Sequence, residues 1–220
     1  MPRIPELTPE EMNPEQKAVF DDIMSGPRGS LRGPFHAWLH SPQLADRAQK
    51  LGAFCRFSST LPKRLSELAI IVIARHWCAQ FEWYAHAPEA IEAGISADAV
   101  EAIRNKGEPE LTEPDEILIY GFVHELLETR TVSQKTYQQT EAVIGHRGIV
   151  DLVGKLVLNV TIGGPKERLN PGDSIQAAIQ SISSVRRVWN WRDRRPTGTL
   201  SSTKVTWTGA ERLRVPIHSP

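Results

Sequence analysis

One stretch of the chain, residues 61–96, constrains the fold more than any other. Pro62 suits the first turn of a helix, and apolar side chains then follow on almost every face: Leu65, Leu68, Ala69, Ile70, Ile71, Val72 and Ile73. A helix that is apolar nearly all round must be covered by neighbours on most sides. We therefore expect this segment to be the central element of a helical fold. Its expected cap is Ser58, Ser59 or Thr60, Pro88 is expected to end or kink it, and Gly94 is expected to stop it.

Charged and imidazole side chains interrupt this apolar segment: Glu67, Arg75, His76, Glu82 and His86. Such groups are costly to bury unless they are paired, so their presence needs a reason. Glu82 and His86 are four residues apart and share one helical face, whereas His86 lies about 100° from Glu67 around an unbroken helix. The three side chains can therefore meet only if the helix bends or breaks between them, near residues 75–79.

The other helix signals predict an all-α fold. N-cap residues precede apolar side chains at helical spacing in five further places: Asn13, Ser41, Ser96, Thr112 and Ser133. No stretch alternates with a period of two for long enough to predict a strand. We expect about six main helices over residues 13–162, with one boundary at Gly145.

The distribution of charge divides the chain into two regions. Residues 1–162 carry 16 Lys and Arg against 22 Asp and Glu, a balance of −6, whereas residues 163–220 carry 10 against 4, a balance of +6. This shift predicts a helical domain over residues 1–162 and a basic, poorly ordered extension over residues 163–220, which includes an amphipathic helix capped by Asp173. The net charge of zero gives no general electrostatic case for binding nucleic acid.

Hydropathy and cysteine content limit the class of protein further. No run of about eighteen apolar residues predicts a membrane span, and the first residues lack the basic and apolar regions of a signal peptide. The two cysteines, Cys55 and Cys78, are too few for a disulfide scaffold and are typical of a reducing compartment. We therefore expect a cytoplasmic protein that binds neither membranes nor nucleic acids.

Residues 67–96, ELAIIVIARHWCAQFEWYAHAPEAIEAGIS, resemble the carboxymuconolactone decarboxylase family, which shares its fold with alkyl hydroperoxidase D. The redox branch of that superfamily carries Glu, then Cys-x-x-Cys, then His, with the Glu nineteen residues before the His. Glu67 and His86 match this spacing, but Ala79 and Glu82 occupy the two cysteine positions. The chain is therefore similar to a non-redox subgroup, and the similarity extends more loosely over residues 5–154.

The resemblance implies a fold, an assembly and an activity. It implies an alkyl hydroperoxidase D-like helical domain that assembles as a homotrimer or homohexamer, and no cofactor is expected. It also implies a decarboxylase that releases CO2 from a small carboxylated lactone or related organic acid. The alternatives are a peroxidase with peroxiredoxin activity and an inactive relative that only binds a small molecule.

Proton transfer is the chemistry that the polar side chains of the central segment support. A carboxyl group in apolar surroundings has a raised pKa, and an imidazole exchanges protons near neutral pH. We predict Glu67, Glu82 and His86 as catalytic residues, with the two carboxyl groups as proton donor and acceptor and His86 tuning Glu82. A divalent metal ion bound by Glu82 and His86 with Glu67 or His76 is an alternative, but no further ligand is distinctively spaced, so we predict no metal.

The substrate-binding residues are predicted from the same segment. Arg75 is suited to hold a substrate carboxylate through two parallel hydrogen bonds, and His76 and Trp83 are expected beside it. In the family the loop over residues 25–42 arrives close to the central helix. Two interpretations of that loop stay open: its histidines and Trp38 line a pocket, or its aromatic side chains only fill the core.

Overall fold

The computed structural model describes residues 4–162, with side chains as far as Asn159. All regular elements in this range are helical, which confirms the predicted all-α class. They are α1 (Pro14–Ser25), α2 (Phe35–Trp38), α3 (Pro42–Ala53), the π-helical segment η1 (Phe54–Ser58), α4 (Lys63–His76), α5 (Gln80–Glu92), α6 (Ala97–Arg104), α7 (Pro114–Thr129) and α8 (Gln134–Ile162). The elements outnumber the six expected because the central segment forms two helices and α2 is a single turn. The predictions for residues 163–220, including the helix at Asp173, lie outside the described residues.

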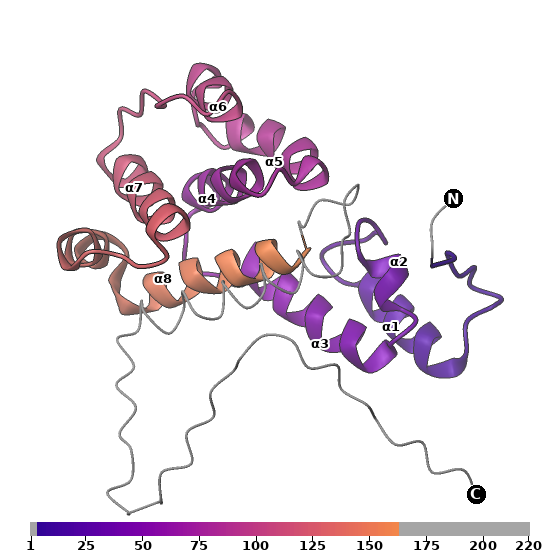
Figure 1. The fold of residues 1–220 in the computed structure, drawn as a ribbon. Coiled ribbons are helices and arrows are strands. Elements are labelled where there is room, and N and C mark those ends of the chain that lie inside the picture. Colours follow the sequence, from indigo (N-terminus) through magenta and orange to yellow (C-terminus); the bar gives the residue numbers. More distant parts are fainter. Residues whose placement is uncertain (1–3, 163–220) are drawn as a thin grey trace, which may run out of the picture.

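Helix α4 is the centre of the fold, as the sequence predicts. Every residue from Leu65 to Ala74 is buried, and α5, α6, α7 and α8 all pack against this helix (Figure 1). Its expected serine or threonine cap is wrong, because Pro62 occupies the cap position without a side-chain hydrogen bond. Thr60 instead donates its backbone N–H and its hydroxyl to Asp151 of α8, at 2.7 and 2.8 Å.

Two apolar clusters hold the helices together. The larger cluster surrounds α4 and includes side chains of α5 to α8. The smaller one joins α1, α2 and α3 through Val19, Ile23, Phe35, Leu39 and Ala45. Figure 1 shows these two groups of helices, with the orange end of α8 running toward α1–α3. Helix α1 begins where the sequence predicts, since the Asn13 side chain accepts a hydrogen bond from the Gln16 backbone in a capping box.

The central segment breaks where the spacing of its polar residues predicts. Helix α4 ends at His76 and α5 begins at Gln80, while Cys78 between them has a left-handed φ of 53°. Of the two outcomes expected at Pro88, an end to the helix does not occur, because α5 continues to Glu92. Burial of Ala87 and Ala90 against the larger cluster offsets the hydrogen bond that proline cannot donate.

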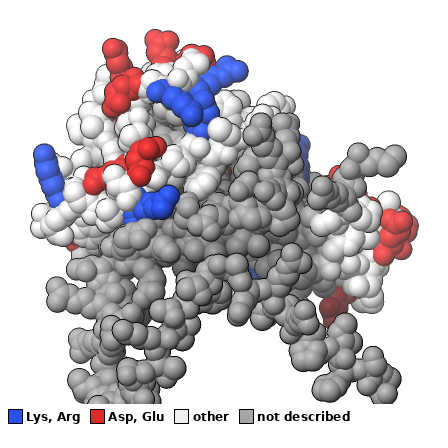
Figure 2. All heavy atoms as spheres, in the orientation of Figure 1, with Lys and Arg blue, Asp and Glu red and all other residues white. Residues whose placement is uncertain are grey.

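The described surface carries both signs of charge. Figure 2 shows acidic and basic side chains interspersed on the visible part of this face that is drawn in colour and white. Among the described residues, some charged side chains pair within one helix, such as Lys17 with Asp21 at 2.5 Å and Lys50 with Asp46 at 2.6 Å. In the range 4–162, no helix has the length and apolar character that crossing a bilayer requires.

Helix α8 contains a break at Gly145, where the sequence predicts a helix boundary. Gly145 has φ 67° and ψ 175°, a conformation that is accessible almost only to glycine. The helix resumes after it and runs along α4. The residues after Gly145 include Asp151, Lys155 and Asn159, so this break sets the direction of a helix that reaches the site described below.

We expect Gly145→Ala to lower the free energy of unfolding by about 1–3 kcal/mol, because alanine is strained in this backbone conformation. No atom lies within 4 Å of the position that a Cβ would take, so crowding plays no part. Gly121→Ala in α7 is the matched control, since its Cβ position is equally open but helical. It should raise stability by about 0.5–1 kcal/mol. Urea unfolding measures the free energy of unfolding of both variants. A Gly145→Ala variant as stable as the wild-type protein would contradict the expectation.

Candidate active site

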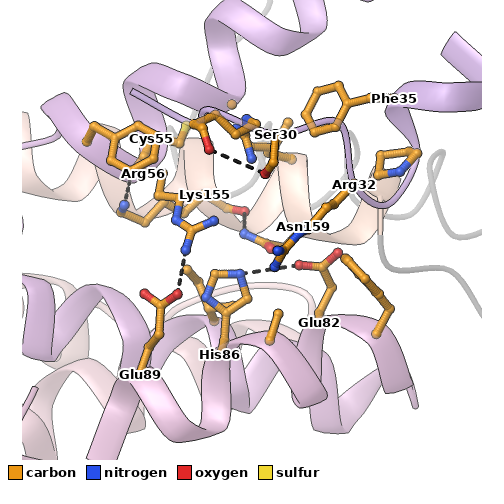
Figure 3. A pocket seen from close by; sticks show the side chains of 18 of the residues that line it. Ser30, Arg32, Phe35, Cys55, Arg56, Glu82, His86, Glu89, Lys155 and Asn159 are labelled. Atoms are coloured by element: carbon orange, nitrogen blue, oxygen red, sulfur yellow. Dashed lines mark hydrogen bonds and ion pairs between the residues drawn. The ribbon is translucent and has the colours of Figure 1, made fainter. Parts of the chain in front are cut away.

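A cavity of about 930 Å³ is lined by residues from both groups of helices (Figure 3). Helix α5 forms one wall, along which Glu82, His86 and Glu89 project. The other walls come from the loop at residues 27–34, from α3 and η1, and from the second half of α8. The volume lies in the range of pockets that hold small organic molecules.

The break between α4 and α5 brings Glu67 against His86. Because the chain turns at residues 77–79, α5 packs along α4 instead of continuing its axis. Nδ1 of His86 then lies 2.6 Å from Oε2 of Glu67, and Nε2 lies 3.5 Å from Oε2 of Glu82. The predicted meeting of these three side chains is confirmed, with the imidazole between two carboxylates.

The carboxylates decide the protonation state of His86. Glu67, Glu82 and His86 are 3, 6 and 7% exposed. Burial by itself would lower the pKa of the imidazole, but hydrogen bonds to Glu67 and Glu82, and their negative charges, raise that pKa to about 9. His86 is therefore protonated at neutral pH, and Nδ1 donates its hydrogen to Glu67.

Glu67 occupies a different position from the other two members of this group. Glu82 and His86 line the cavity, whereas Glu67 reaches the imidazole from α4 and is not among the lining residues. The sequence predicts Glu67 as one of two carboxyl groups that exchange protons with a substrate. Its place favours a positioning role instead, in which it fixes the orientation and the charge of the imidazole.

Cationic side chains face the cavity from its other walls: Arg28, Arg32, Arg56 and Lys155. The guanidinium of Arg28 lies over the Phe35 ring, 4.6 Å from its centroid. Burial lowers the pKa of Arg28, and the charge of Arg56 lowers it further. The three guanidinium groups and the protonated imidazole outnumber the two carboxylates of the lining. The cavity is therefore suited to an anionic ligand.

The three predicted substrate-binding residues lie elsewhere. Arg75 donates from Nε to the Arg104 carbonyl at 2.5 Å, at the end of α6. His76 Nδ1 lies 3.3 Å from Glu128 of α7, and Trp83 packs against the larger apolar cluster. None of the three is part of the cavity lining. Arg75 and His76 are in the last turn of α4, where side chains reach α6 and α7 rather than the cavity.

The segment over residues 25–42 lines part of the cavity through Arg28 and Arg32, which are not among the predicted site residues. His36 lies in α2 and His40 just after it, and neither lines the cavity. Both bond to backbone carbonyls, His36 Nε2 to Leu31 at 3.1 Å and His40 Nε2 to Pro5 at 2.8 Å. Phe35 belongs to the smaller cluster and Trp38 packs against it, with ring centroids 5.4 Å apart. The core-filling interpretation holds for Trp38, whereas Phe35 also lines the cavity.

A repeated Arg-Gly pair is the signal that could have identified Arg28 and Arg32. Each arginine precedes a glycine with positive φ, 60° at Gly29 and 68° at Gly33. A Cβ at Gly33 would lie 3.0 Å from the Phe81 ring, so the loop approaches α5 closely there. Glycine at these positions lets the loop turn twice and present both arginines to the cavity.

Three groups at one end of the cavity lie close enough to bind a metal ion. Ligand atoms of Glu67, His86 and Glu89 are all within 4.8 Å of one another. However, Glu67 is bonded to His86, and Glu89 pairs with Arg56 at 2.5 Å and lies 3.7 Å from Lys63. The carboxylate oxygens of Glu67 and Glu89 therefore already have positively charged partners. The positive charge beside them disfavours the binding of a divalent cation.

The raised pKa of His86 predicts lower stability at high pH. A group whose pKa is higher in the folded protein stabilises it fully below the unfolded value, near 6.5, and this contribution is lost as the pH rises through the folded value of about 9. At about 1.4 kcal/mol per unit, the loss is on the order of 3 kcal/mol. Urea unfolding at pH 6 and pH 9.5 measures it. His86→Gln should lack this part of the decrease, and an equal decrease in both proteins would contradict the assignment.

The chain was compared with known proteins by sequence. No protein-family model matches it, and no curated protein is significantly similar to it.

Proposed function

We propose that this protein is a decarboxylase that acts on a small carboxylated lactone or a related organic acid through general acid–base catalysis. The observation that carries the proposal is the buried His86 imidazolium, held by Glu67 and placed beside Glu82 in the cavity wall. The positive lining suits a substrate that bears carboxylate groups. The resemblance of residues 67–96 to the carboxymuconolactone decarboxylase family points to the same class of reaction.

The proposed mechanism assigns one task to each member of the group. Loss of CO2 leaves an electron pair on carbon, and Nε2–H of His86 donates the proton that this carbon takes. Glu67 accepts the hydrogen bond from Nδ1–H and holds the ring in place. Glu82, 3.5 Å from Nε2, takes a proton from water and passes it to the imidazole before the next turnover. His86 and Glu82 are thus catalytic residues, and Glu67 is a positioning residue.

Arg28 and Arg32 are the proposed anchors for a substrate carboxylate. Both line the cavity, whereas Arg75 does not. Arg56 is less suited to this task because it is already paired with Glu89. A planar guanidinium that is held over an aromatic ring, as Arg28 is over Phe35, is well placed for two parallel hydrogen bonds to a carboxylate.

The redox alternative is less well supported. Peroxidase chemistry of this kind needs a thiolate of low pKa and a second thiol nearby. Cys55 lines the cavity from η1, but burial raises the pKa of its thiol. Cys78 is exposed and lies in the turn between α4 and α5, outside the cavity lining. The two thiols are therefore not placed as a redox pair.

The assembly and the compartment follow from the resemblance and the composition. We infer a homo-oligomer, which the exposed apolar side chains of Leu44, Leu51 and Phe54 on α3 and η1 support. Light scattering during size-exclusion chromatography tests it, and a purely monomeric protein would contradict it. Two free cysteines support a cytoplasmic location.

Glu82→Gln should lower the turnover number for CO2 release by about 10²–10⁴-fold, the usual share of acid–base catalysis. A screen of lactone acids and β-keto acids with wild-type protein first identifies a substrate. Glu92→Gln on the same helix is the matched control, because Glu92 is exposed and does not line the cavity. Full activity of a folded Glu82→Gln variant would reduce its contact with His86 to a structural one. No CO2 release from any acid would favour an inactive binding protein.

Two arginine variants distinguish the anchor that the geometry favours from the one that the sequence predicts. Arg28→Gln should raise KM by about 10–100-fold, because a hydrogen bond to a charged group contributes roughly 1.5–3 kcal/mol. Arg75→Gln should leave KM unchanged, since Arg75 bonds to the Arg104 carbonyl outside the cavity. The opposite pattern in steady-state kinetics would return the anchoring role to Arg75.

A further inference from the structure

Lys155 is the cavity residue that the proposed acid–base mechanism leaves without a task. It lies on α8 and is only 1% exposed, yet it is part of the cavity lining. Its Nζ donates a hydrogen bond to the Cys55 carbonyl in η1, as Figure 3 shows. A lysine is rarely buried to this extent unless it is paired with a carboxylate.

The environment of Lys155 lacks such a partner. None of the ion pairs formed among residues 4–162 includes its ammonium group. Asp151, one turn earlier on α8, uses a carboxylate oxygen to accept two hydrogen bonds from Thr60. Burial lowers the pKa of Lys155, although Cys55, Glu67 and Asp151 each oppose this effect. The amine is therefore neutral in a larger fraction of molecules than a surface lysine is.

The hydrogen bond to η1 also leaves the amine free to react. A neutral amine that donates one N–H to a carbonyl keeps its lone pair for another bond. The π-helical segment supplies that carbonyl beside the cavity, and such segments occur often at functional sites. A desolvated amine of this kind is the usual form of a lysine nucleophile.

We propose that Lys155 is a nucleophile that forms an imine with the ketone of a β-keto acid substrate. The acid class of this substrate rests on the proposed function, whereas the nucleophilic character of Lys155 does not. Figure 3 shows Lys155 and Asn159 of α8 across the cavity from Glu82 and His86 of α5. A substrate bound between these walls meets the amine on one side and the proton donor on the other.

The steps of this reaction balance without a further co-reactant. The Nζ lone pair forms a bond to the ketone carbon. The ketone oxygen takes one proton from the amine and one from solvent and leaves as water, which gives the protonated imine. The bond to the carboxylate carbon then breaks, CO2 leaves, and the electron pair passes to the protonated imine to give an enamine. Nε2–H of His86 protonates the enamine carbon. Water hydrolyses the new imine, which releases the ketone and restores the amine.

Reductive trapping of the full chain tests the proposal. Wild-type protein is incubated at pH 7 with sodium cyanoborohydride and either acetoacetate or formaldehyde, and modified lysines are located by peptide mass spectrometry. Formaldehyde, the smallest probe, should modify Lys155 at least about tenfold faster than Lys50, an exposed lysine paired with Asp46. Acetoacetate should leave an isopropyl group on Lys155, because the trapped imine has already lost CO2.

A pair of variants supplies the control. The Lys155→Arg variant should lose both the modification at position 155 and CO2 release. The Lys50→Arg variant should keep the modification of Lys155 and CO2 release. Circular dichroism reports whether Lys155→Arg is folded, and the mapping of the wild-type protein decides the question if it is not.

The outcomes separate this proposal from the proposed function. CO2 release that depends on Glu82, with no modification of Lys155 by either probe, would overturn the imine and leave the acid–base function intact. Modification of Lys155 by formaldehyde without CO2 release from any acid would support the nucleophile and count against the decarboxylase. Equal modification of Lys50 and Lys155 would overturn the proposal.

Discussion

Glu67 lies within α4, the most buried helix in the described part of the chain, and a carboxylate there needs a partner of opposite charge. His86 supplies it, 2.6 Å away, on a helix that the chain must fold back to bring into place. Buried ion pairs of this kind add little net stability, because both charges lose their hydration. The α4–α5 turn, in which Cys78 has a left-handed conformation, brings the two residues together, and Glu82 lies 3.5 Å from the other ring nitrogen of His86. Its most direct consequence is chemical, since it keeps a proton on an imidazole that faces a cavity.

The Glu67–His86 pair contributes to the charge of the cavity, because His86 is one of the residues that line it. The wall carboxylate beside His86 partly offsets the positive charge of the protonated imidazole. Because of the guanidinium groups, the net charge of the side chains that line the cavity is nevertheless positive. An anion that enters is met by Arg28 and Arg32 from the loop and by the proton of His86 from α5. Lys155 adds a group of another kind, an amine whose burial lowers its pKa. One cavity thus holds the residues that we propose as anchor, proton donor and nucleophile.

The sequence predicts the parts of this arrangement that depend on local spacing. The angle between Glu67 and His86 on a helix requires a break between them, and the break lies where that argument places it. The apolar side chains on nearly every face of α4 predict its central place, because such a helix must be covered by neighbours on most sides. Arg28 and Lys155 are separated by more than a hundred residues, and neither belongs to a local pattern that points to the other. They meet only because α8 packs against α4 and η1 while the loop approaches α5 at Gly33, and this arrangement leaves Arg75 outside the cavity.

The protonation state of His86 tests the account most directly. Nitrogen-15 NMR of the imidazole rings resolves the seven histidines, and His86→Gln assigns the signal. Both ring nitrogens of His86 should carry hydrogen at pH 7.5, with a titration midpoint at a pKa of about 9. A neutral ring at pH 7.5, with a midpoint at or below the ordinary value of about 6.5, would contradict the account.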